Sequence, residues 1–278
     1  VDGTVALTTH GTGAATIVND AALTFAASTV GGALTATATT GNITDSGALA
    51  ITGTTTLVTS ADNATIALDT TTNAFTGALT ITTNDSSGTD ADVTIDGGTT
   101  ALDIAASTID GDLTLTSGNV SGITDSGTVT VGGNLSATTD ANAGVINLGT
   151  MAVDGTIALT TNSTGAATIV NDAALNFSTS TVGGALTATA TTGDITDSGT
   201  LTITGASIFK TGATGSNIVL DSASNAYSAA VTMIADAGGE TFGNITFVDS
   251  AAIDFATSAS SNGDLYINAA TDGAVGGN

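Results

Sequence analysis

The side chains that could do chemistry are few and mostly of one kind. The 278 residues hold one Lys or Arg, one His and no Cys, against 25 Asp or Glu, of which only Glu240 is Glu. A chain without Cys has no disulfide, thiol nucleophile or thiolate metal site. The formal charge of −24 excludes a phosphate-binding surface, because nucleic-acid affinity depends on Lys and Arg displacing counterions. Any remaining chemistry must come from Asp, His10, Lys210 or Glu240.

An internal duplication provides a test of these candidates. Residues 1–57 recur as residues 153–209, and 44 of the 57 positions are identical. None of the three rare side chains recurs: the equivalents of His10, Lys210 and Glu240 are Asn162, Val58 and Gly88. We therefore interpret His10 as a solvated loop residue and Lys210 as an exposed residue at a strand end, rather than as a general base and a reactive amine. Residues 118–122, Gly-Asn-Val-Ser-Gly, do not fit the nucleophile-elbow pattern.

The aspartates are the other candidates, since paired carboxylates cleave glycosides and clustered ones bind Ca²⁺. Among those that recur with the duplication, Asp20, Asp45 and Asp69 become Asp172, Asp197 and Asp221. Repetition favours a structural role, because an active site is normally built once. The Gly-Gly-x-Gly-x-Asp repeat of calcium-binding β-rolls is missing from the sequence. We therefore predict no enzyme, no catalytic, cofactor-binding or metal-site residues and no resident cofactor, with structural Ca²⁺ kept as an open alternative.

The elements that carry these residues are predicted to be strands. Asp in place of Glu, 36 Gly, many Thr, Val and Ile, and almost no Lys or Arg remove the residues that favour helices. A hydrophobic fraction of 41% is too high for a disordered acidic tail. Polar residues interrupt every apolar run before about 18 residues, so we expect no membrane-spanning helix.

A shorter period lies within the duplicated unit. The turn residue that begins each segment is Gly in ten segments and Ala in one. In nine of the eleven segments the residues two and four places later are both apolar and are predicted to point inward, and the residues between them are mostly Thr or Ser. The two exceptions, Thr55 and Ser207, are the same position in the two copies. The turn residues, or anchors, are Gly3, Gly32, Gly53, Gly77, Gly111, Gly133, Gly155, Gly184, Gly205, Ala229 and Gly263. The sequence Ile-Thr-Asp-Ser-Gly occurs at 43–47, 123–127 and 195–199. We interpret it as a turn in which Asp and Ser bond the local backbone and Gly supplies a positive φ.

Units of about 25 residues cannot bury their own apolar face and must stack on one another. We therefore predict an all-β, right-handed parallel β-helix (β-solenoid) of about eleven turns with a 152-residue super-repeat. Residues 1–152 form the first super-repeat, and residues 153–278 form a second, incomplete one that is continuous with it. In this prediction Leu113, Leu135 and Ile157 occupy one interior file. Immunoglobulin-like sandwiches are disfavoured, because each needs about 100 residues.

Residues 181–205, followed by Ile218–Asp221 and Asn225–Tyr227, resemble the repeats of filamentous-haemagglutinin-like bacterial surface proteins. The resemblance implies a β-helix shaft, export through the outer membrane and a role in adhesion, aggregation or fibre formation. The family's secretion-domain motifs are not visible in this sequence. The start at Val1, without an apolar leader, leads us to expect a piece of a longer, processed protein.

The functional prediction is a structural β-solenoid shaft of an extracellular or cell-surface filament or adhesin. Its expected partner is itself, end to end, side by side or through further repeats, together with a cell-surface or polysaccharide ligand; nucleic acid and a membrane span are not expected. One alternative is a Ca²⁺-dependent surface-layer or adhesin module. The other is an ice-binding protein, suggested by outward Thr-x-Thr pairs, although Val58, Ala158, Ile208 and Lys210 interrupt that array.

Overall fold

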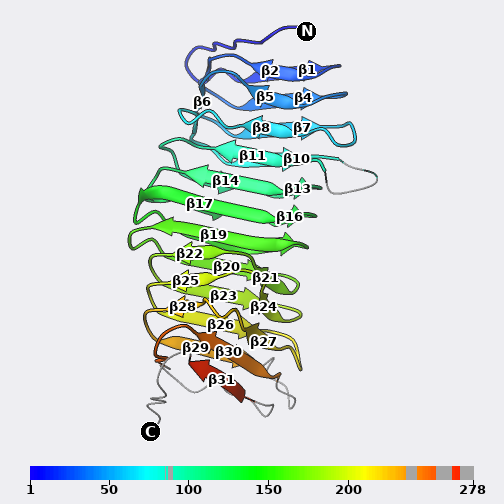
Figure 1. The fold of residues 1–278 in the computed structure, drawn as a ribbon. Helices are drawn as coiled ribbons and strands as arrows, with labels where there is room; N and C mark the ends of the chain where they lie inside the picture. Colours follow the sequence, from blue (N-terminus) through cyan, green and yellow to red (C-terminus); the bar gives the residue numbers. More distant parts are fainter. Residues whose placement is uncertain (85, 87–89, 236–242, 255–264, 270–278) are drawn as a thin grey trace.

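The computed structural model describes residues 1–84, 86, 90–235, 243–254 and 265–269. These residues form a parallel β-solenoid of about ten turns and contain no helix, so the predicted fold class is confirmed. Figure 1 shows the turns stacked as layers from the N-terminus downward. The described part of the chain accordingly has no helix of the length and hydropathy needed to cross a bilayer.

The strands belong to three sheets, and every pairing between described strands is parallel. Sheet 1 consists of β1 (Ala15–Asn19), β4 (Leu34–Ala38), β7 (Thr55–Thr59), β10 (Leu79–Thr82), β12 (Leu102–Ile104), β13 (Ser107–Ile109), β15 (Ile123–Asp125), β16 (Val129–Val131), β18 (Ile146–Val153), β20 (Ala167–Asn171), β23 (Leu186–Ala190), β26 (Ser207–Thr211) and β29 (Val231–Ala235). Sheet 2 consists of β2 (Leu23–Phe25), β5 (Ile43–Asp45), β8 (Ile66–Leu68), β11 (Val93–Asp96), β14 (Leu113–Ser117), β17 (Leu135–Asn142), β19 (Thr156–Asn162), β21 (Leu175–Phe177), β22 (Ser180–Val182), β24 (Ile195–Asp197), β25 (Leu201–Ile203), β27 (Ile218–Leu220), β28 (Ala226–Tyr227), β30 (Ile245–Asp249) and β31 (Leu265–Ala269). Sheet 3 consists of β3 (Ser28–Val30), β6 (Leu49–Ile51) and β9 (Ala74–Phe75).

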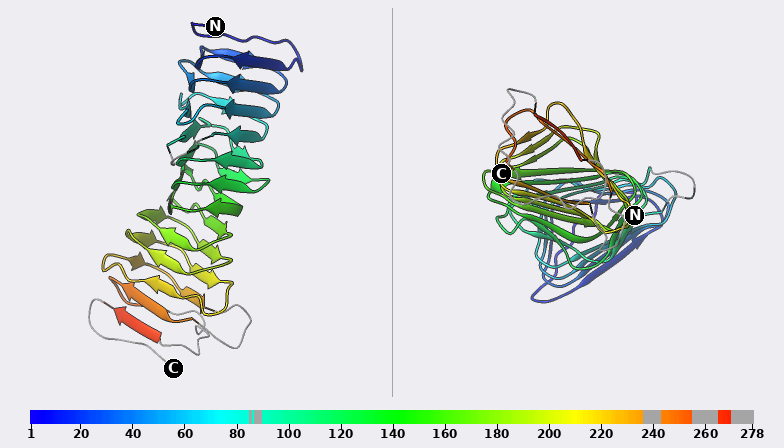
Figure 2. Two further views of the ribbon diagram at one scale, coloured as in Figure 1. Left: turned by 90° about the vertical axis from the view of Figure 1, so that its right-hand side faces the viewer. Right: turned by 90° about the horizontal axis from the view of Figure 1, so that it is seen from below.

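The cross-section of the rod changes along its length. The first three layers have three short strands each, one per sheet, whereas β17, β18 and β19 in the middle are 7 or 8 residues long. Beyond them, the single strand β19 pairs with both β21 and β22, which restores three strands per layer. Seen along the axis, the blue and yellow layers extend in different directions from the green middle layers (Figure 2). The boundary between residues 152 and 153 falls inside β18, so it marks a sequence period within a continuous strand.

The core is one continuous cluster of buried aliphatic and aromatic side chains. Leu113 pairs with Leu135, and Leu135 pairs with Ile157, and all three are buried, so the predicted interior file is confirmed. Burial of apolar area in each file stabilises the fold by about 25 cal/mol per Å². Successive layers lie about 4.8 Å apart.

The segments that follow the anchors do not all occupy equivalent places in the solenoid. Leu34 pairs with Thr55 and Thr55 with Leu79, on sheet 1, whereas the file that contains Leu113 lies on sheet 2. The period-2 pattern distinguishes inward from outward residues, but it does not say which sheet a strand joins. In the fourth layer the chain reaches sheet 2 at Val93, which no glycine anchor precedes.

The anchor glycines owe their identity to contact between layers. A Cβ at Gly53 would lie 2.5 Å from the carbonyl carbon of Gly32, and one at Gly205 would lie 2.4 Å from that of Gly184. The amide N–H of each of these glycines also donates to the carbonyl of the glycine in the layer before, at 3.0 Å for Gly53 and 2.9 Å for Gly205. A side chain at either position would push adjacent layers apart.

Candidate functional site

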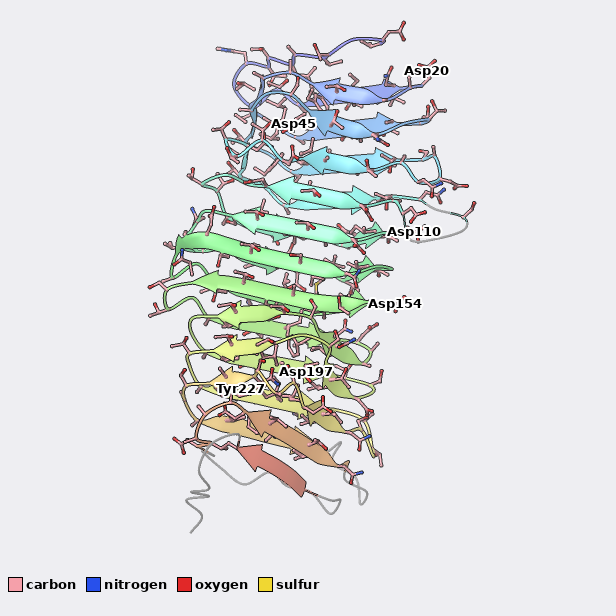
Figure 3. All side chains as sticks on the ribbon, viewed as in Figure 1. Asp20, Asp45, Asp110, Asp154, Asp197 and Tyr227 are labelled. Atoms are coloured by element: carbon pink, nitrogen blue, oxygen red, sulfur yellow. The ribbon has the colours of Figure 1, made fainter. Side chains whose placement is uncertain are left out.

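Polar side chains of Asp and Asn concentrate at the corner where the chain passes from sheet 1 to sheet 2. Figure 3 shows Asp20, Asp110 and Asp154 along this edge of the rod. They lie in the short connections that follow β1, β13 and β18. Polar side chains from several layers therefore gather along one edge of the rod.

Directly before the sheet 2 strands, the side chains at this corner form a ladder. The backbone N–H of Asp112 donates to Oδ1 of Asp92 at 2.8 Å, and that of Asn134 donates to Oδ1 of Asp112 at 2.7 Å. The N–H of Thr156 then donates to Oδ1 of Asn134 at 2.8 Å. Each side chain therefore accepts the N–H of the equivalent residue one layer further on. The same relation joins Asn42 to Thr65, Asp194 to Asn217, and Asn217 to Asn244.

The repeated Ile-Thr-Asp-Ser-Gly turn also bonds between layers. Oδ2 of Asp197 accepts Nδ2 of Asn225 at 2.6 Å, and its Oδ1 accepts the N–H of Asp221 at 2.9 Å. Asp45 accepts the corresponding bonds from Asn73 and Asp69, at 2.6 and 3.3 Å. Asp125, in the third occurrence, accepts the N–H groups of Gly149 and Thr150 instead. The prediction of local backbone bonds by Asp was therefore wrong, because these bonds cross from one layer to the next.

The glycine of this turn was also misinterpreted. Gly47, Gly127 and Gly199 are not among the described residues with positive φ. Instead, a Cβ at these positions would lie 2.6, 2.6 and 2.2 Å from the backbone nitrogen of a residue in the preceding layer. Close approach of two backbones, rather than a left-handed conformation, requires glycine here.

Two buried asparagines connect these turns to the interior. Asn73 and Asn225 are almost fully buried, and their Oδ1 atoms accept the N–H of Leu49 at 2.7 Å and of Leu201 at 2.8 Å. Each therefore bridges a surface carboxylate, Asp45 or Asp197, and a buried strand. Neither asparagine was predicted to have this role, although the two recur at the 152-residue offset.

An acidic groove lies at the end of β11 on sheet 2, beside the turns that connect β8 to β9 and β11 to β12. It has a volume of about 270 Å³ and is lined by Thr71, Asp96, Gly98, Thr99, Gly118, Asp140 and Ala141. Burial raises the pKa of Asp96, and the neighbouring carboxylates Asp140, Asp69 and Asp45 raise it further, against a bond from the Gly98 N–H that lowers it. No group of three or more acidic or His side chains converges as metal ligands within the described residues.

The rare side chains are far apart in the fold. His10 is exposed in the loop before β1, and its carbonyl accepts the N–H of Gly13 at 3.1 Å. Lys210 is exposed on β26, the tenth strand along the main path of sheet 1. Glu240 lies outside the described residues. The structure therefore does not bring His10 and Lys210 together, and it does not place either of them in the acidic groove.

The outward Thr columns that suggested ice binding lie on two different sheets. Val58, Ile208 and Lys210 interrupt the outward Thr columns of sheet 1, whereas Ala158 interrupts a column of sheet 2. Within the first super-repeat, Thr16, Thr35, Thr56 and Thr80 form one unbroken column on sheet 1.

Comparison with known proteins places the repeats in a family. A model described as repeats of unknown function (DUF5649) matches residues 12–82, 90–148 and 164–234. The first and last matches are displaced by 152 residues, which is the period of the super-repeat. No curated protein and no solved structure matches this chain. Since the matched segments cover more than two thirds of the sequence, the chain belongs to this family of β-solenoid repeats.

Proposed function

We propose that the chain is a structural, non-enzymatic shaft of an extracellular or cell-surface filament or adhesin. The observation that carries the proposal is the unbroken path of parallel pairing along sheet 1 from β1 to β29, over one continuous core. Bending such a rod would require breaking backbone hydrogen bonds on one side and opening the core on the other. A stiff spacer is the function that this architecture supports best.

The polar residues support the same conclusion. Asp45, Asp125, Asp197, Asp92 and Asp112 accept backbone or side-chain hydrogen bonds from the next layer. Their carboxylates therefore stabilise the stacking of layers, a role that recurs with the repeat. The resemblance of residues 181–205 to filamentous-haemagglutinin-like repeats supports a place on the cell surface. A single Lys or Arg leaves few sites for trypsin-like proteases, which suits exposure outside the cell.

The proposed partner is another copy of the same kind of repeat, either continuing the stack or lying beside it. Solenoid ends expose strand edges, which pair readily with further strands. A cell-surface or polysaccharide ligand belongs to the adhesin form of the proposal, and nucleic acid does not, because the phosphate-binding cations are missing. No resident cofactor is proposed.

Electron microscopy of the purified chain and of the native material tests the proposal. Eleven strands along sheet 1 at about 4.8 Å predict straight particles on the order of 50 Å long, and a continuous fibre in the native material. Compact particles, or chains that bend freely between layers, would overturn it. Thermal hysteresis of ice growth tests the ice-binding alternative, which the Thr16–Thr80 column favours, and a melt with chelator tests the Ca²⁺-dependent one.

A further inference from the structure

The outer surface of sheet 1 carries few charged side chains. On β1, β4, β7 and β10 the side chains alternate between the core and solvent, and the strands are in exact register through four layers. The eight outward residues are Thr16, Val18, Thr35, Thr37, Thr56, Val58, Thr80 and Thr82. None is charged, although the chain carries a net charge of −24. We call the outward residues of sheet 1 the sheet 1 face.

The sheet 1 face continues into the second super-repeat with a single positive charge. The equivalent outward residues there are Thr168, Val170, Thr187, Thr189, Ile208, Lys210, Thr232 and Ile234. Lys210 is the only Lys or Arg of the chain. Between these two sets of four strands, Asp103 on β12 is the one acidic side chain that points outward from the interior of a sheet 1 strand.

Apolar exposure also concentrates on this face. Four large hydrophobic side chains are exposed among the described residues, and two of them, Val18 at 66% and Ile208 at 40%, belong to the sheet 1 face. The acidic side chains lie mainly at the corners and, on sheet 2, around the groove formed by Asp96 and Asp140. The sheet 1 face is therefore the side on which another strongly acidic rod meets the least repulsion.

The size of the sheet 1 face matches that of a stable contact. Eleven strands at about 4.8 Å, each about five residues wide at about 3.3 Å per residue, cover on the order of 800 Å². A standard protein–protein interface buries about 800 Å² on each partner. The four strands β1, β4, β7 and β10 alone cover only about 300 Å² by the same measure, so a contact of standard size requires most of the sheet 1 face.

We propose that the sheet 1 face is a lateral docking surface for the same face of a second copy of this chain. The proposal rests on the proposed function, since it explains how stiff shafts associate side by side. Corner carboxylates on the two rods repel at low ionic strength and are screened at high ionic strength. Lys210 supplies the one cation that attracts the acidic corners of the neighbouring rod.

Sedimentation velocity of the purified chain tests the docking surface. We expect monomers in about 20 mM NaCl and dimers or larger species in about 1 M NaCl, where the Debye length is about 3 Å. Thr56→Glu, at the centre of the first super-repeat's face, and Lys210→Glu, on the second, should each weaken association at least tenfold. The matched control Thr116→Glu, outward on β14 of sheet 2, should associate like the unmodified chain.

Folding of each variant is checked by circular dichroism and thermal melting. Lys210→Val introduces the residue that stands at the equivalent position, Val58, and should retain association in 1 M NaCl. Monomers at every salt concentration, or equal weakening by Thr56→Glu and Thr116→Glu, would overturn the docking surface. If the same particles remain straight single rods in micrographs, the proposed function survives that failure; if they are not rods, the proposed function fails too.

Discussion

The two super-repeats have the same strands at equivalent positions and differ in the side chains of their cores. Strands β1 to β9 recur as β20 to β28 with every bound displaced by 152 residues. The core of the second copy holds a row of aromatic rings, in which Phe177 and Phe209 lie 6.2 Å apart edge to face, followed by Tyr227 at 6.1 Å and Phe247 at 4.7 Å. The first copy has Leu57 where the second has Phe209. Register and turns are therefore fixed more tightly than the identity of the core side chains.

Several residues that are identical in both copies make contacts between layers, whereas some that differ lie in the core. Asn73 and Asn225, Asp45 and Asp197, and Gly53 and Gly205 keep both residue type and contacts in the two copies. A core side chain can change in size when its neighbours adjust. A polar bridge or a backbone contact between layers cannot adjust, because the spacing between layers is set by the hydrogen bonds of the sheets.

The largest effect is expected from removing the buried asparagine in either copy. Asn73→Ala leaves the buried N–H of Leu49 without its acceptor and removes the bond to Asp45, and Asn225→Ala does the same to Leu201 and Asp197. Each change should lower the free energy of unfolding by about 3 kcal/mol. Urea denaturation followed by circular dichroism measures the loss.

Asn147→Ala, at an exposed outward position of β18, is the matched control and should cost less than about 0.5 kcal/mol. The comparison between copies predicts similar losses for Asn73 and Asn225. A large loss in one copy and none in the other would show that the two turns do not share one structural role.

The second effect concerns the glycine contacts between layers. Gly53→Ala and Gly205→Ala place a Cβ within about 2.5 Å of a backbone carbon, so each should cost about 2 kcal/mol. Gly149→Ala is the control, because its Cβ meets nothing closer than Asp125 Oδ1 at 3.9 Å. Equal stability of the Gly53 and Gly149 variants in the same urea titration would contradict the glycine argument.

The sequence predicts the stacked strands because apolar and polar residues alternate in a pattern that recurs along the chain. The alternation of Leu113 and Leu115 with Thr identifies an inward face, and the recurrence of that pattern gives the stacking. The change from two strands per layer to three could not be predicted, since β19 and the pair β21 and β22 carry the same alternation. The acidic groove was not predicted either, because only the stacking of layers brings Asp96 and Asp140 to one place.

The hydrogen bonds that the turn residues make between layers were harder to predict from the sequence. Asp45 and Asn73 are 28 residues apart, and only the stacked structure brings their side chains to 2.6 Å. Their joint recurrence as Asp197 and Asn225 was a signal that could have linked them. Repetition of two polar residues at one offset indicates a contact between adjacent layers in a solenoid.

A third, smaller effect is a loss of stability at alkaline pH that is expected from the second copy and not from the first. Tyr227 replaces Phe75, and its buried hydroxyl has no hydrogen-bond partner among the residues that the structure describes. Burial raises its pKa far above the usual 10.0, and the carboxylates of Asp197 and Asp249 raise it further. Because the pKa is higher in the folded chain than in the unfolded chain, stability is retained below about pH 10 and falls as the pH rises above it.

Tyr227→Phe should remove this alkaline loss and leave stability at pH 7 unchanged or higher by about 1 kcal/mol. Phe75→Tyr should transfer the alkaline sensitivity to the first copy. Melting temperatures between pH 7 and pH 11 measure both variants. An alkaline loss that persists in Tyr227→Phe would show that another group is responsible.

A still smaller effect is expected at Asp96, whose equivalent in the second copy is Val248. Its pKa is raised from the usual 3.8, so the folded chain disfavours the charged carboxylate at neutral pH. Asp96→Asn should raise stability at pH 7 by a few tenths of a kcal/mol, since the site is partly open to solvent. The gain should disappear as the pH falls below about 4, where the carboxyl group is protonated in both states. A gain that is the same at pH 3 and pH 7 would exclude charge as its cause.

The smallest expected effect is that of a chelator on the melting midpoint. It tests the same difference between the copies, Asp96 in the first and Val248 in the second. If a divalent cation occupied the groove of Asp96 and Asp140, it would stabilise the first super-repeat and not the second, where Val248 replaces Asp96. The carboxylates at the corners already accept hydrogen bonds from the next layer, so the stack does not need a cation to hold it. We therefore expect the same melting midpoint with and without EDTA at constant ionic strength. A lower midpoint with EDTA that Asp96→Asn abolishes would instead assign a Ca²⁺ site to this groove.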